Sequence, residues 1–268
     1  MTSSLLRPRG RARVNTLVGG TTAAHGDRST GGTAPTRILD WQHPRVVALV
    51  RDVGATSDPD PALQVAALRR AHGLITAAVR PVYSVQDERP VSEVLRRGLG
   101  SCSQRLAVLE AVARATGVAT RVRGLLVDGA FWYPRFPRLQ RIVPDQVLLA
   151  WPEFRIVERQ HAGRATERWL TVSELFGTLE ELSGDAGGGF TNSGPETLFE
   201  ALSRTAIDWD GAAVCSAADA ACDLSAHVLA DLGHFDSRDE LFARHGQTLC
   251  GMARLLAEPV MGRRAAGA

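Results

Sequence analysis

The feature that most constrains the fold is a cysteine that opens a helix, with a strand following directly after that helix. The segment 98–117, GLGSCSQRLAVLEAVARATG, carries its apolar residues at helical spacing and ends on a glycine, which predicts a helix over 102–116. Residues 118–128, VATRVRGLLVD, alternate and then become apolar, which predicts a strand entering a core. A helix and strand joined by so short a turn pack antiparallel, so the end of the strand returns toward the cysteine.

Further helices and strands are predicted on both sides of this pair. Pro61 and Pro81 bracket one helix, and a short helix runs up to Gly98. Two strands are predicted at 143–157 and 167–172, and three more helices are expected at 171–182, from Pro195 to 207, and at 236–259. This order predicts an α+β fold in which the central helix packs on an antiparallel sheet. We expect a disordered leader over 1–36 and a single domain over 37–268, with a helical C-terminal part over 195–268.

The composition excludes several classes of function. The net charge is only +2, which gives no reason to expect nucleic acid or an anionic membrane as a partner. No lysine is present, so no Schiff base can form on a lysine side chain. The N-terminus lacks the apolar run of a signal peptide, which predicts a cytoplasmic protein with free thiols. The spacings of Cys102, Cys215, Cys222 and Cys250 match no zinc pattern, and neither a metal nor another cofactor is expected.

Cys102 has a position that suits nucleophilic chemistry. The first turn of a helix offers partial positive charge and unpaired N–H groups, and both favour a thiolate. The same N–H groups can hold the oxyanion that forms on an attacked carbonyl, which is worth about 3–4 kcal/mol per donor. Gly98 and Gly100 leave room for a carbonyl to approach. The alternative is that Cys102 is a buried structural residue.

At this point the segment resembles the transglutaminase-like superfamily of papain-type thiol enzymes, over residues 98–169. The matching pattern is G-x-C, a helix, a glycine stop and G-V-x-x-R-V-x-G, at Gly100, Cys102, Gly117, Val118, Arg121, Val122 and Gly124. The resemblance implies a histidine on the second following strand and an aspartate on the third. Gln146 stands near the first of these positions, and Ser173 beside Glu174 near the other, so the triad is altered.

Other residues are therefore candidates for the acid and the base. Asp128 ends the strand after the cysteine helix, and about 15 helical residues and about 7 strand residues both span roughly 22 Å, so Asp128 can lie beside Cys102. The alternative is a turn aspartate before Gly129. For the base we select His245, with His234 and His227 as the other candidates.

The chain order Cys102, Asp128, His245 also resembles the Dieckmann cyclases of bacterial tetramate and pyridone biosynthesis. That resemblance implies an acyl chain transferred from a carrier-protein thioester to Cys102. His245, oriented by Asp128, would then remove the acidic proton between two carbonyls, and the carbanion would attack the Cys102 thioester and close the ring. A positioned general base contributes about 10²–10⁴-fold to such a rate.

An aromatic cluster and a run of arginines follow Asp128, and each has a functional and a structural interpretation. The aromatic residues Phe131, Trp132, Tyr133 and Phe136 could line an acyl pocket or simply pack the loop. Arg135, Arg138 and Arg141 could contact an acidic carrier protein or form a solvated face. The alternative functions are an amide-forming transferase or a hydrolase on the same thiol, including a leader-peptide protease, and a transglutaminase-like binding protein without activity.

Overall fold

The computed structural model describes residues 29–55, 57, 60–136, 140, 143–159, 165–177, 196–205, 207, 209, 225–249 and 251–263. Within them the fold is mixed α+β, as predicted. The helices are α1 (Pro44–Val53), α2 (Pro61–Ala78), α3 (Val91–Arg97), α4 (Cys102–Ala115), α6 (Leu198–Ala201), α7 (Arg238–His245) and α8 (Gly251–Met261), with 3-10 turns η1 (Gly129–Arg135) and η3 (Ser225–His227). The strands are β1 (Arg80–Pro81), β2 (Leu99–Gly100), β3 (Thr120–Asp128), β4 (Gln146–Arg159), β5 (Ala165–Thr171) and β6 (Val228–Phe235).

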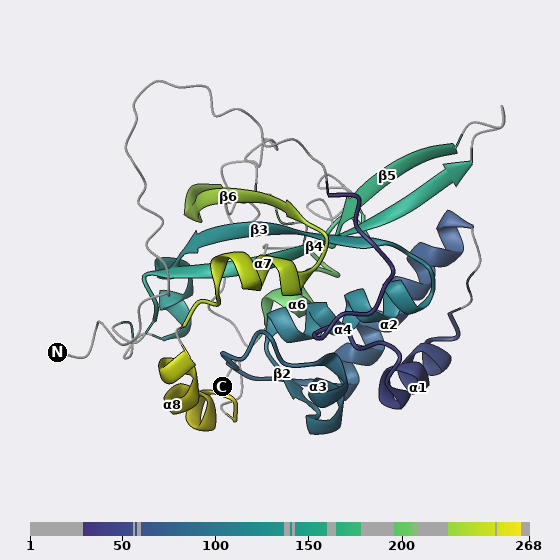
Figure 1. Cartoon of the computed structure of the whole chain (residues 1–268). Coiled ribbons are helices and arrows are strands. Elements are labelled where there is room, and N and C mark those ends of the chain that lie inside the picture. The colour runs from purple at the N-terminus through teal and green to yellow at the C-terminus, as the bar shows by residue number, and fades with distance from the viewer. Residues whose placement is uncertain are drawn as a thin grey trace, which may run out of the picture.

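The main sheet has four antiparallel strands in the order β5-β4-β3-β6, and β1 and β2 form a separate parallel pair. The register of β3 and β4 runs from Thr120 opposite Phe154 to Asp128 opposite Gln146. Figure 1 shows the sheet above a layer that contains α4, α2, α3 and α1. The helix that begins at Cys102 therefore packs on an antiparallel sheet, as the sequence predicts.

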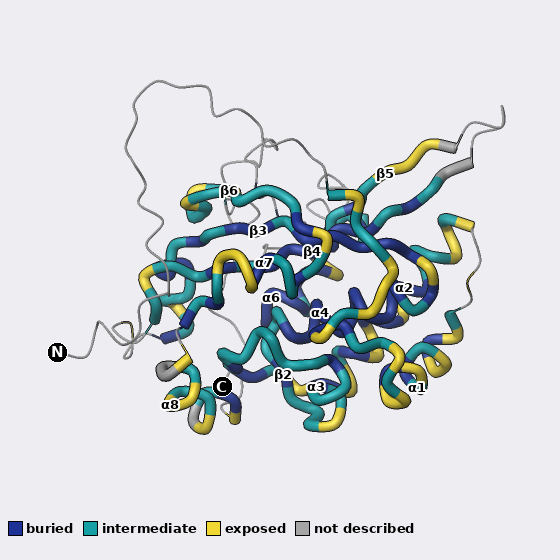
Figure 2. Tube along the Cα trace, viewed as in Figure 1, coloured by how far each residue is buried: buried dark blue, intermediate teal, exposed yellow. Residues whose placement is uncertain are grey.

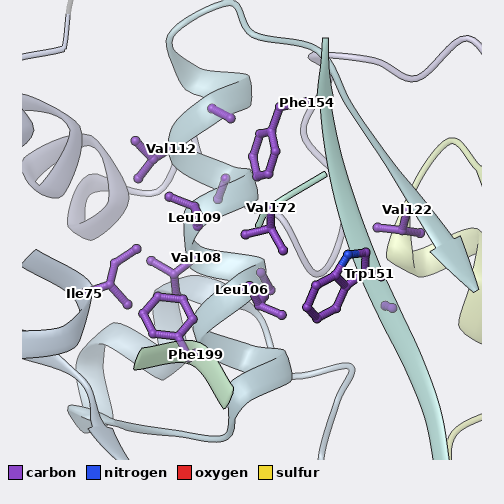
Figure 3. Close-up of a cluster of buried hydrophobic side chains, with 14 of the residues drawn as sticks. Ile75, Leu106, Val108, Leu109, Val112, Val122, Trp151, Phe154, Val172 and Phe199 are labelled. Atoms are coloured by element: carbon purple, nitrogen blue, oxygen red, sulfur yellow. The ribbon is translucent and has the colours of Figure 1, made fainter. Parts of the chain in front are cut away.

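Helix α4 lies at the centre of the core. Figure 3 shows its apolar side chains between α2 and β4, with Leu106 and Val112 among them. The helix is buried on every side from Gln104 to Arg114, which Figure 2 shows as a nearly continuous buried stretch. The sequence predicts one apolar face, but the polar face is buried too. Arg114, for example, donates to the Thr120 hydroxyl at 2.7 Å and to backbone carbonyls.

The C-terminal part departs from the prediction in two ways. It contains strand β6, which was not predicted and which pairs with β3 at the edge of the sheet. The region 236–259, expected as one helix, is two helices because Gly246 takes φ 77°, a left-handed conformation that α-helix cannot accommodate. Similarly, the helix expected from Pro195 is only the four-residue α6, while 172–176 is a turn and Pro195 and 178–182 lie outside the described residues.

The expected leader is ordered over its last residues. Gly32 forms a bridge with Thr120 of β3, and Gly31 N donates to Asp236 Oδ1 at 2.9 Å. Gly31 has φ 63°, and a Cβ there would lie 2.4 Å from the Trp169 ring. Glycine thus lets this segment pair with the first residue of β3, so residues 31–32 pack against the sheet. Residues 1–28 lie outside the described residues.

Candidate active site at the start of helix α4

The first turn of α4 is closed by a capping box. Ser101 Oγ accepts from Gln104 N at 3.3 Å, and Gln104 Oε1 accepts from Ser101 N at 3.0 Å. Cys102 follows as the first helical residue, half-buried against the edge of the core with a free thiol. Among the described residues, neither the Cys102 N–H nor the Ser103 N–H donates a hydrogen bond. The helix start therefore keeps two backbone donors beside the sulfur.

The glycines before Cys102 have a packing role. Gly98 ends α3 with φ 59°. At Gly100 a Cβ would lie 3.0 Å from Val94 Cγ1 and 3.1 Å from Val79 Cγ1. The space beside Gly100, which we expected to admit a substrate carbonyl, is therefore filled by side chains from α3 and from the end of α2.

The loop between β1 and α3 lies on this first turn. Gln104 Nε2 donates to Ser84 Oγ at 2.9 Å and to Gln86 O at 2.7 Å. The next residue of that loop, Asp87, donates its N–H to Gln247 Oε1 at 3.0 Å. Gln104 of the capping box thus fixes a loop that is also hydrogen-bonded to the connection between α7 and α8.

Asp87 belongs to a buried polar network beneath Cys102. Its carboxyl group lies close enough to Arg238 and to Ser103, the residue after the cysteine, for both to lower the pKa of Asp87. Ser103 Oγ in turn accepts from Arg238 Nη1 at 3.0 Å, and Arg238 also donates to Glu110 and, at 3.1 Å, to Ala150 O. Arg238 and Glu110 are completely buried. One guanidinium therefore lies between two carboxyl groups.

Asp87, one of the two carboxyl groups near Arg238, has a shifted pKa. Although part of residue 87 is exposed, burial of its carboxyl group raises the pKa of Asp87 to about 6, against the opposing effects of Arg238 and Ser103. Burial likewise raises the pKa of Glu110, although Arg238 opposes the shift. A carboxyl group with a pKa of about 6 thus lies near Ser103, the residue next to Cys102. The sequence carries no signal for Asp87, because an acidic residue in a loop before Pro90 is ordinary.

Asp128 lies where β3 turns into η1, in line with the alternative of a turn aspartate. Its carboxylate accepts from Ala130 N at 2.8 Å and begins η1. Asp128 is paired with Gln146 on β4. The start of α4 lies at Ala150, four residues further along β4, because Arg238 donates to both Ala150 O and Ser103 Oγ. Four strand residues span about 13 Å. In the described part of the chain, no hydrogen bond or ion pair joins Asp128 to Cys102.

The three candidate bases have different surroundings. His245 is the last residue of α7, is exposed, and packs edge-on against Phe235; partial burial and then Arg244 lower the pKa of His245. It lies two residues before Gln247, which holds the Asp87 loop. His234 Nε2 contacts Glu153 Oε1 at 3.1 Å.

The remaining candidate base and the predicted acyl pocket lie at the other end of the β3–β6 pair. His227 packs on Phe131, and Phe131 is buried edge-on against Trp132, as loop packing predicts. Arg135 donates to Glu196 O, and Arg138 and Arg141 lie outside the described residues. The structure thus places the loop of Asp87 and the chain that follows His245 at the first turn of α4, through the bonds from Gln104 to Gln86 and from Asp87 to Gln247.

The two altered triad positions serve local structure. Gln146 is half-exposed at the first position of β4. Ser173 is buried in the turn after β5, and Glu174 accepts from Thr171 N at 2.7 Å in the same turn. These residues therefore do not take the roles of the histidine and the aspartate that the resemblance implies.

The comparisons with known proteins leave the site to be interpreted from its own chemistry. No family model, no curated protein and no solved structure matches this chain. Within the described residues, no three side chains of His, Cys, Asp or Glu gather as metal ligands would. No described helix is both long and apolar enough to cross a membrane.

Proposed function

We propose that the protein is a cysteine-nucleophile acyl-transfer enzyme with a transglutaminase-like, papain-type core. The observation that carries the proposal is a half-buried Cys102 with a free thiol at the start of the buried helix α4, beside two backbone N–H groups without a partner among the described residues. Such donors match the oxyanion of a tetrahedral intermediate. The antiparallel sheet packed on α4 agrees with the expected core.

The reaction that we propose is a Dieckmann-type cyclisation in bacterial secondary metabolism, such as antibiotic biosynthesis. The Cys102 thiolate attacks the carbonyl of a polyketide–amino acid chain on a carrier protein, and the carrier thiolate leaves. His245 then takes the acidic proton between two carbonyls. The resulting carbanion attacks the Cys102 thioester, a carbon–carbon bond forms, and the Cys102 thiolate is expelled as the ring closes.

Asp87 has better support than Asp128 as the carboxyl group of this site. Its carboxyl group lies near Ser103 and Arg238, whereas Asp128 is engaged with the backbone of η1. We propose that Asp87 sets the charge beneath the thiol, and that the protonation of Asp87 changes the reactivity of Cys102 around pH 6. Asp128 and His245 remain predictions as catalytic residues.

Capture of an acyl group tests the proposal. The protein is incubated with an N-acetylcysteamine β-ketoacyl thioester, and the adduct is located by mass spectrometry after digestion. The chain has no lysine, so trypsin releases Cys102 in the peptide 98–105, Cys250 in 245–254, and Cys215 with Cys222 in 205–238. We expect an adduct on 98–105 in the native protein and in Cys250→Ala, and none in Cys102→Ala.

A second candidate is a transglutaminase-like binding protein without activity. It is favoured by the packing of Cys102 against the core and by the engagement of Asp128 and His234 with other groups. No adduct on peptide 98–105 with any acyl thioester, together with an unchanged free energy of unfolding in Cys102→Ala, would support this function over the enzyme.

A further inference from the structure

A cavity of about 350 Å³ lies between α3, the loop at residues 86–89 and α8. In Figure 1 both helices lie on the side of the molecule away from the sheet. The charged residues that line it are Arg89, Glu93, Arg96, Arg97, Glu258 and Arg263. This volume lies in the range of small-molecule sites. We refer to it as the α3–α8 groove.

The α3–α8 groove has more positive charge than negative charge. Glu258 Oε1 accepts from Arg89 at 2.6 Å and from Arg97 at 3.3 Å, so one carboxylate serves two guanidinium groups. Glu93 is engaged through both oxygens with Arg96, each at 2.6 Å. Arg263 makes no hydrogen bond or ion pair with any described residue. Four arginines against two glutamates leave two positive charges in excess.

The floor of the groove is fixed before any ligand binds. Glu258 also accepts from Ser84 Oγ and from Val85 N, each at 2.9 Å. The side chains of Arg89 and Arg97 are only 13% and 21% exposed. Ser84 accepts from Gln104 of the α4 capping box, so the groove adjoins the first turn of α4. A ligand would therefore meet guanidinium groups whose positions are already set.

We propose that the α3–α8 groove binds the phosphate group of a small ligand. Guanidinium groups match phosphate oxygens in paired hydrogen bonds. A phosphate monoester carries about −1.5 to −2 charges at pH 7, which balances the excess in the groove. Leu255, 66% exposed, and Pro259 form an apolar edge against which the organic part of an ester can lie. The proposal goes beyond the acyl chemistry and does not depend on Cys102.

Calorimetric titration at constant ionic strength tests this site with three probes: inorganic phosphate, adenosine 3′,5′-bisphosphate and acetate. The test variant is Arg96→Gln/Arg263→Gln, because both side chains are exposed and neither holds the floor of the groove. The matched control is Arg51→Gln, whose side chain is 79% exposed on α1. Circular dichroism confirms that each variant is folded.

We expect at least one phosphate compound to bind the native protein, Arg51→Gln and Cys102→Ala equally. Loss of charge-assisted hydrogen bonds should weaken binding to the double variant by about tenfold or more. Binding of both probes would identify the phosphate group alone as sufficient, and binding of the ester only would identify a phosphate ester as the ligand. Binding of neither, equal binding of acetate, or equal affinity in the double variant would overturn the proposal. Because Cys102→Ala is included, failure here is distinguishable from failure of the acyl-transfer proposal.

Discussion

Replacement of Arg238 by Met is expected to be the most destabilising single change among the polar residues of the site. Arg238 and Glu110 are completely buried, and Glu110 Oε2 has no hydrogen-bond partner among the described residues, so the guanidinium is the counter-ion that this carboxyl needs. Removal of one member of a buried ion pair costs about 3–5 kcal/mol, because the other charge remains uncompensated. Arg238→Met also breaks the bonds to Ser103 and Ala150 O. We therefore expect the free energy of unfolding, measured by urea denaturation, to fall by at least about 3 kcal/mol.

Two further variants separate this reasoning from a general effect of mutation on α7. Arg244→Gln removes an exposed i,i+4 pair with Glu240 on the same helix, and should change the free energy of unfolding by no more than about 0.5 kcal/mol. The double variant Arg238→Met/Glu110→Met should recover most of the loss, because no buried charge of that pair remains. A cost below about 1 kcal/mol for Arg238→Met, or a double variant as unstable as the sum of the single variants, would refute the argument.

Two other predictions concern the pH dependence of stability and a backbone conformation. The pKa of Asp87 is about 6 in the folded protein and about 3.9 in an unfolded chain, so the folded state binds more protons and stability falls as pH rises from about 4 to about 6. Asp87→Asn should remove this decline in the free energy of unfolding, which is no more than about 3 kcal/mol. In urea denaturation at a series of pH values, the variant-minus-native difference should grow over this interval, and a constant difference would contradict the prediction. Gly31→Ala should cost about 1–3 kcal/mol, because it adds a clash with the Trp169 ring to the strain of a left-handed conformation. Gly117→Ala, whose Cβ would meet nothing within 4 Å, should cost less in the same thermal or urea assay, and an equal cost would contradict the packing argument.

Elements whose pattern is complete within their own residues are predictable from the sequence. Helices α2, α3 and α4 and strands β3, β4 and β5 all occur where prolines, glycines and apolar spacing predict them. Strand β6 was missed because its alternation is interrupted by Gly233 and because its register with β3 shifts twice. Its stability comes from pairing with β3, a contact that local spacing does not report.

The candidate site is only partly predictable for a related reason. The position of Cys102 at a helix start follows from local sequence, and the structure confirms it. The network near it joins Ser103, Glu110 and Arg238 by hydrogen bonds, with Asp87 close to Arg238, and these residues come from α4, α7 and a loop. From the sequence alone, Glu110 and Arg238 would each be placed on the solvent-exposed face of a helix. Burial of both charges results from covering α4 on every side, which no pattern within one helix predicts.

Competitive alkylation of the four cysteines tests whether Cys102 is the reactive nucleophile of this protein. The native protein is treated with limiting iodoacetamide near neutral pH, and the tryptic peptides 98–105, 245–254 and 205–238 are quantified over time. We predict that peptide 98–105 is modified first and that Asp87→Asn changes its rate most around pH 6. If peptide 98–105 is modified no faster than the other two, Cys102 is an ordinary thiol and the account is contradicted.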